Sequence, residues 1–65
     1  MCLFKVYADD PNLGKRLIAE NIAFISKGDG FIKIVDIESK EKIVTNVEIL
    51  SIDALNSTLI LKQIQ

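Results

Sequence analysis

Cys2 carries the only thiol of this 65-residue chain, and it directly follows Met1. When a thiolate lies one residue from a free α-amino group, the amine nitrogen, the backbone amide nitrogen and the sulfur are close enough to chelate one ion. Such nitrogen and sulfur ligands suit Ni(II) or Cu(II) in tetragonal or square-planar geometry, and soft sulfur donors also suit Cu(I) and zinc. The first two residues therefore predict a metal site with Cys2 and Met1 as its ligands.

A competing hypothesis is that Cys2 is an ordinary small hydrophobic residue of the first strand, because free cysteine is among the most buried residue types and is often inert. The chain has one cysteine and no histidine. A single chain therefore cannot complete a four-ligand zinc site, in which Cys and His dominate. Two chains that meet at Cys2 could.

The opening Met1-Cys2-Leu3, followed by Lys5-Val6-Tyr7, resembles the start of the CooT-type nickel-binding proteins, very short chains linked to maturation of carbon monoxide dehydrogenase. The resemblance continues over nearly the whole chain, in Glu20-Asn21-Ile22, in Ile32 and Ile34 before Asp36-Ile37, and in Ile49, Ile52-Asp53, Asn56, Ile60 and Leu61. It implies a homodimer that binds Ni(II) through Cys2. It also implies a nickel enzyme or its maturation proteins as partners.

The charge composition argues against a nucleic-acid interface. Eight basic and nine acidic residues give a formal net charge of −1, which indicates a mixed, solvated surface. An RNA-binding module of the Sm-like or OB-like type is nevertheless the second function to consider, because such barrels bind single strands through basic grooves and stacking aromatics. The side chains that could build that face are Tyr7, Phe24 and Phe31 with Lys5, Lys27 and Lys33.

Catalysis is not expected. Without histidine there is no Ser-His-Asp or Cys-His nucleophile. Asp9-Asp10 lies in one predicted turn, and Glu38 and Glu41 flank another. Gly28-Asp29-Gly30 lacks the Lys-Ser/Thr of a phosphate-binding loop. No apolar stretch reaches the roughly 18 residues that cross a bilayer, and no signal peptide is recognisable, so we expect a cytoplasmic protein.

Alternation of apolar and polar residues predicts strands over residues 2–8, 16–26, 31–37, 42–52 and 57–63, with the second strand bent or bulged near Glu20-Asn21. The whole chain, residues 1–65, is expected to form one all-β domain, a small five- to six-stranded antiparallel barrel of the SH3-like or Sm-like type. A chain this short buries a thin core and gains from a metal or a second copy.

The same alternation predicts which side chains share a face. Cys2, Phe4, Val6 and Ala8 are expected on the core side of the first strand, and Leu59 and Leu61 on one side of the last. Three further sets are expected to share a face each: Ile18, Ile22 and Phe24; Ile32 and Ile34; and Ile43, Val47 and Ile49. The third strand is apolar on both sides, so either a curled sheet or another subunit must cover it.

Overall fold

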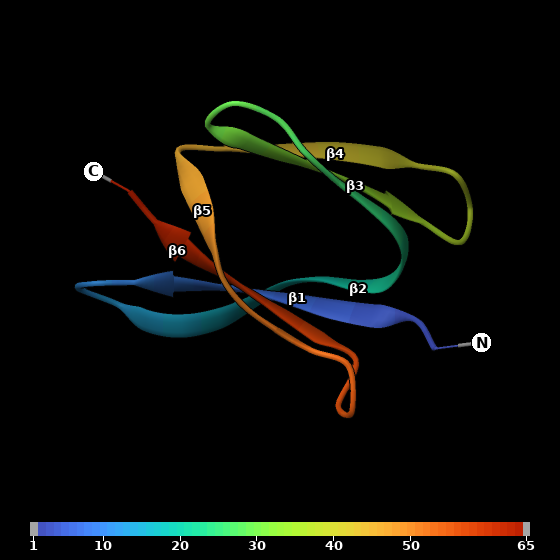
Figure 1. Ribbon diagram of the computed structural model, residues 1–65, viewed down its shortest axis with the longest axis horizontal. Coiled ribbons are helices and arrows are strands. Elements are labelled where there is room, and N and C mark those ends of the chain that lie inside the picture. The colour runs from blue at the N-terminus through green and yellow to red at the C-terminus, as the bar shows by residue number, and fades with distance from the viewer. Residues whose placement is uncertain (1, 65) are drawn as a thin grey trace.

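The computed structural model describes residues 2–64, which form strands, turns and loops without a helix. The strands are β1 (Phe4–Asp10), β2 (Gly14–Lys27), β3 (Phe31–Asp36), β4 (Glu41–Thr45), β5 (Val47–Asp53) and β6 (Thr58–Gln63). They make one six-stranded sheet in the order β4-β3-β2-β1-β6-β5, curled into a half-barrel (Figure 1). The predicted all-β class is confirmed.

The long strand β2 belongs to both halves of the curled sheet. Its first half pairs with β1 and its second half with β3. Between them Asn21 adopts a left-handed backbone with φ 55°, and the register with β3 shifts between Ile22 and Phe24. An extra residue of this kind bends a strand and increases its twist. The bend predicted near Glu20-Asn21 is confirmed, and it carries β2 from the lower to the upper strands in Figure 1.

One predicted strand is two strands in the structure. Residues 42–52 do not form a continuous strand, because Asn46 takes a φ of 58° and separates β4 from β5. The kink changes the alternation, so that Val44 packs against the core while Ile43 is 51 % exposed. The expectation that Ile43 shares a face with Val47 and Ile49 is therefore wrong.

The kink at Asn46 also explains the one parallel pairing. β5 runs in the same direction as β4 instead of turning back. Because the other consecutive strands reverse direction, β6 runs in the same direction as β1. These two strands pair in parallel, from Lys5 opposite Thr58 to Asp9 opposite Lys62. The other neighbouring strands pair antiparallel, as predicted.

The core fills the inner side of the curled sheet. Its buried side chains are Val6, Ala8, Ile22, Ile32, Ile34, Val47, Leu59 and Leu61. Alternation placed Val6 with Ala8, Ile32 with Ile34 and Leu59 with Leu61, and each of these pairs is confirmed. The bulge in β2 turns Phe24 outward, where it is 53 % exposed, so the expectation that Phe24 shares a face with Ile22 is wrong.

Candidate metal centre

Cys2 lies just before β1 and is exposed as a free cysteine. The hypothesis of a buried, inert cysteine is therefore wrong for the single chain. The following residues are fixed on both sides: Phe4 pairs with Ile22 of β2, and the backbone N–H of Lys5 donates to the carbonyl of Ser57 at 2.9 Å. Cys2 is thus presented two residues before a strand that is held on both edges. The other predicted ligand, Met1, lies outside the described residues.

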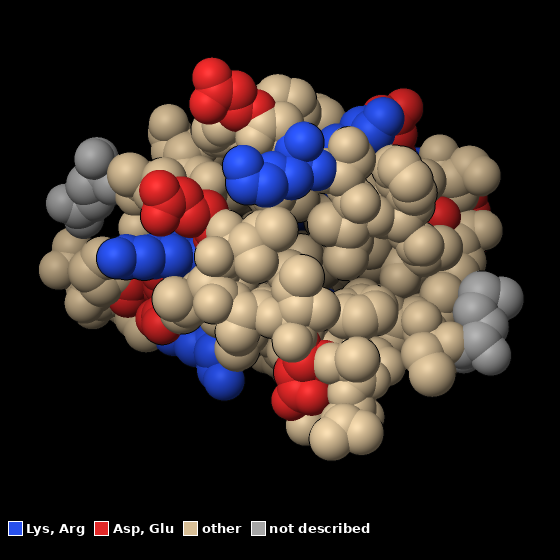
Figure 2. All heavy atoms as spheres, viewed as in Figure 1, with Lys and Arg blue, Asp and Glu red and all other residues tan. Residues whose placement is uncertain are grey.

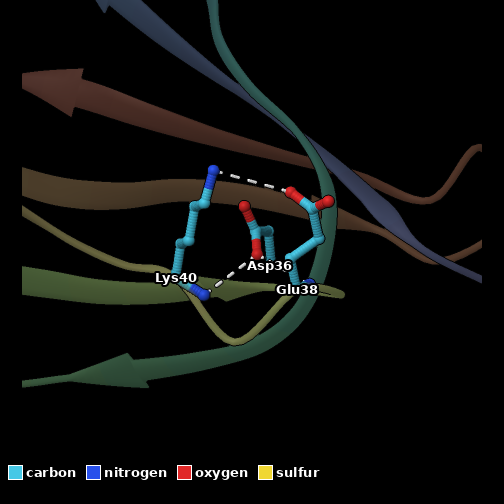
Figure 3. A network of polar contacts seen from close by, with 3 residues as sticks. All are labelled: Asp36, Glu38 and Lys40. Carbon is cyan, nitrogen blue, oxygen red and sulfur yellow. Dashed lines mark hydrogen bonds and ion pairs between the residues drawn. The ribbon is translucent and has the colours of Figure 1, made fainter.

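One acidic turn frames this end of the sheet. Asp36 lies at the end of β3, opposite Ile22, which in turn lies opposite Phe4. One oxygen of its carboxylate accepts the backbone N–H groups of Glu38, at 2.8 Å, and Lys40, at 3.0 Å. Figure 3 shows this turn, closed further by an ion pair of 3.7 Å between the side chains of Lys40 and Glu38. The Asp36 carboxylate therefore stabilises the turn by accepting these backbone hydrogen bonds.

A second acidic turn lies on the other side of β1. Asp53 pairs with Thr58, and Thr58 pairs with Lys5. The Asp53 carboxylate accepts the side-chain amide of Asn56 at 2.7 Å and its backbone N–H at 3.2 Å. These two bonds, the side-chain bond first, hold the pKa of Asp53 below its ordinary value. Like Asp36, this carboxylate is engaged in a turn.

The bend in β2 completes the frame. The carbonyl of Asn21 accepts the backbone N–H of Ile37 at 3.1 Å, which ties the β3–β4 turn to the strand that pairs with Phe4. Asn21, Asp36, Asp53 and Asn56 all belong to the residue groups that carry the family resemblance. The sequence predicted a bend at Asn21 and a turn at Asp53 and Asn56, and it placed Asp36 in a strand. It gave no signal that all of them surround the start of β1, because that depends on the curl of the sheet.

The same end carries large apolar side chains that face solvent. Ile37 is 55 % exposed, Ile52 is 63 % exposed and Leu55, in the β5–β6 turn, is 97 % exposed. Each lies next to one of the framing turns, and Leu3, half-buried, adjoins Cys2. We call Leu3, Ile37, Ile52 and Leu55 the Cys2 rim. Exposed apolar side chains at one end of a small protein are candidates for a surface that contacts another molecule.

The donor set of one chain is incomplete. Within residues 2–64, no group of three or more His, Cys, Asp or Glu side chains could hold a metal ion. One chain offers the Cys2 sulfur and the backbone nitrogen beside it, which are donors of the type that Ni(II) accepts. The residues present thus fit a nickel ion if a second chain supplies another thiolate.

The face drawn in Figure 2 carries side chains of both charges. On the face drawn in Figure 2, Lys, Arg, Asp and Glu side chains are interleaved, without a continuous basic stripe among the described residues. Of the aromatic and basic residues proposed for RNA binding, Lys33 lies over Phe24 at 5.8 Å, whereas Tyr7 is approached by Lys15, at 5.5 Å, which was not among them. Lys33 is also 3.9 Å from Glu41.

Comparison with known proteins identifies the family. The family model of CooT, the CO dehydrogenase accessory protein, matches residues 1–62. A crystal structure from Carboxydothermus hydrogenoformans, provisionally assigned as CooT, superposes with a TM-score of 0.82 over 98 % of this chain and 100 % of that chain, at 11 % sequence identity. At that identity the likeness concerns the fold alone. No match is found among curated proteins. In residues 2–64 no helix is long and apolar enough to span a membrane. The match over residues 1–62 shows that the chain belongs to the CooT family of CO dehydrogenase accessory proteins.

Proposed function

We propose that this protein handles nickel during maturation of CO dehydrogenase, and that one Ni(II) is held between two chains by the Cys2 thiolate of each. The protein is a cytoplasmic homodimer in this proposal, and it delivers or stores metal without catalysing a reaction. Nickel is its cargo, and a nickel enzyme or its maturation proteins are its partners. Membership in the CooT family supports the accessory role.

The observation that carries the nickel proposal is the exposure of Cys2 at the end of a fixed strand. A buried cysteine would pack as a small hydrophobic side chain, whereas an exposed one can reach both a metal and a second chain. The turns around it occupy the carboxylates of Asp36 and Asp53. Sulfur and backbone nitrogen are thus the donors that this end of the molecule offers, and this pair favours nickel over Mg²⁺ or Ca²⁺, which prefer oxygen.

The Cys2 rim supports a second copy as the partner that completes the site. Two thiolates on one ion require that a two-fold axis pass beside Cys2, and such an interface buries the same patch on both chains. Ile37, Ile52 and Leu55 are the exposed apolar side chains at this end. Nitrogen donors near Met1 and Cys2 would complete the coordination. Because the thiol must lose its proton to bind, nickel affinity falls as the pH falls.

Titration with Ni(II) under reducing conditions tests this proposal. We expect thiolate-to-nickel charge-transfer absorption that saturates at one nickel per two chains, with the stoichiometry read by native mass spectrometry. The bands vanish in Cys2→Ser. A matched control places a thiol elsewhere: Ser51→Cys in the Cys2→Ser background keeps one exposed cysteine on edge strand β5, and it should not restore the bands. Absence of these bands in the parent protein would contradict the metal role.

A further inference from the structure

A hollow of about 300 Å³ lies between edge strand β4 and the strands opposite it, away from the Cys2 rim. Four consecutive residues of β4 (42–45) line one side, and Ala8 of β1, Arg16 and Ile18 of β2 and Gln63 of β6 line the other. Ala8 lies six residues along the chain from Cys2, or about 20 Å in an extended strand. The hollow is therefore a site separate from the proposed metal centre.

Two basic side chains meet at this hollow. The ammonium of Lys42 reaches across from β4 and donates to the carbonyl of Ile18 on β2 at 3.4 Å. Arg16 precedes Ile18 by two residues, so both lie on the same face of β2. Among the described residues the ion pairs are those of Lys33 with Glu41 and Lys40 with Glu38, and neither Arg16 nor Lys42 takes part in them. The two positive charges at the hollow therefore lack an acidic partner within residues 2–64.

An acidic side chain on β1, Asp10, is hydrogen-bonded within the β1–β2 turn. Asp10 follows Ala8 by two residues on β1 and shares its face. One of its carboxylate oxygens accepts the backbone N–H groups of Asn12, at 2.8 Å, and Leu13, at 3.1 Å, within the β1–β2 turn. Among the described residues, Asp10 therefore forms a turn and makes no ion pair with Arg16 or Lys42.

The remaining lining adds neutral donors and an apolar floor. β4 is the last strand of the sheet, so alternate backbone N–H groups of this strand point away from β3 and lack a ladder partner. Gln63 also lines the hollow, and its side-chain amide donates to the carbonyl of Asn46 at 3.4 Å. Ala8, Ile18 and Val44 contribute hydrocarbon surface. Positive charge and N–H donors above an apolar floor suit a ligand with an anionic head and a short aliphatic tail.

We propose that this hollow binds a small aliphatic carboxylate. The head group is held by Arg16 and Lys42, and the tail lies on Ile18 and Val44. The volume of about 300 Å³ is large enough for a carboxylate with a short aliphatic tail. The site does not involve Cys2, so its occupation needs no nickel.

The test is an amide chemical-shift titration of metal-free protein with sodium butyrate, sodium acetate and sodium chloride at constant ionic strength. Butyrate should move the amides of residues 16–18 and 42–45 and of Gln63, with saturation. It should bind more tightly than acetate by about two- to fourfold for each added methylene that reaches the apolar floor. Arg16→Gln and Lys42→Gln should each weaken butyrate by about two- to fivefold, as expected for the loss of an exposed ion pair.

Lys27→Gln is the matched control, because Lys27 is exposed at the far end of β2 and pairs with Ile32. It should leave butyrate affinity unchanged. Lys42→Arg keeps the positive charge and should still bind butyrate. The proposal is overturned if butyrate and chloride move the same amides equally, or if Lys27→Gln weakens binding as much as Arg16→Gln.

Discussion

Leu55→Ser separates the proposed dimer from the fold of the single chain. Leu55 is 97 % exposed in the β5–β6 turn, so it contributes little to the stability of one chain. If two chains meet at the Cys2 rim, its side chain becomes buried. Full burial of a leucine side chain is worth about 1.5–3 kcal/mol. A two-fold interface buries the residue twice, which gives about 3–6 kcal/mol for the pair. Because about 1.4 kcal/mol corresponds to a factor of ten, the dimer dissociation constant should rise at least about a hundredfold.

Sedimentation over a range of protein concentrations, with and without Ni(II), measures this constant. Leu13→Ser is the control, since Leu13 is 75 % exposed in the β1–β2 turn, at the other end of β1 from Cys2 (Figure 1). It should leave the dimer intact. In dilute samples the two variants should unfold at the same urea concentration. A dimer that survives Leu55→Ser unchanged, or that dissociates equally in both variants, would refute an interface at the Cys2 rim.

Three further substitutions test the fold around the site. Leu61→Ala removes a side chain that is 0 % exposed and should lower the free energy of unfolding by about 2–5 kcal/mol in urea titrations. Asn21→Val forces a β-branched residue into a φ of 55° and should cost about 1–2 kcal/mol, whereas Asn21→Gly should be tolerated. Asp53 has a pKa held below 3.8 by Asn56, so its charge stabilises the fold above that pH and the effect is lost as the pH falls through the lower folded value. The stability difference between the parent and Asp53→Asn should therefore shrink as the pH falls below 3.8, measured by urea titration at each pH.

The sequence predicted the core wherever a strand is regular. In β1, β3 and β6 the alternation is unbroken, and the side chains it placed inward, such as Val6, Ile34 and Leu61, are buried. The wrong placements are Cys2, Phe24 and Ile43. Cys2 precedes β1 and is exposed, and the other two lie close to a register shift or a left-handed residue that breaks the alternation. Asparagine adopts left-handed backbone more readily than most residues, but it also occurs in ordinary strands and loops. The sequence alone therefore could not determine which side chains face the core beyond each kink.

The two candidate sites differ in how far the sequence could reveal them. Cys2 and Met1 were identified from residue type alone, but extrapolating the alternation placed Cys2 in the strand, whereas β1 begins at Phe4. The hollow at Arg16 and Lys42 had no sequence signal. Two basic residues far apart in the sequence line one hollow because β2 bends and β4 lies across from it. A site that depends on one residue type can be identified from the sequence, whereas a site that depends on the curvature of the sheet cannot.

Nickel binding, dimerisation and stability are linked in this proposal by the position of Cys2. Within residues 2–64 the buried core consists of eight hydrophobic side chains, while ten large hydrophobic side chains are exposed, so one chain gains relatively little from its own burial. Burying the Cys2 rim in a dimer would add apolar contacts at the end of the molecule that supplies the metal donors. A ligand that binds the folded pair and not the unfolded chain stabilises the folded pair by mass action. Nickel should therefore raise the melting temperature of the parent, more strongly at higher protein concentration, and leave that of Cys2→Ser unchanged.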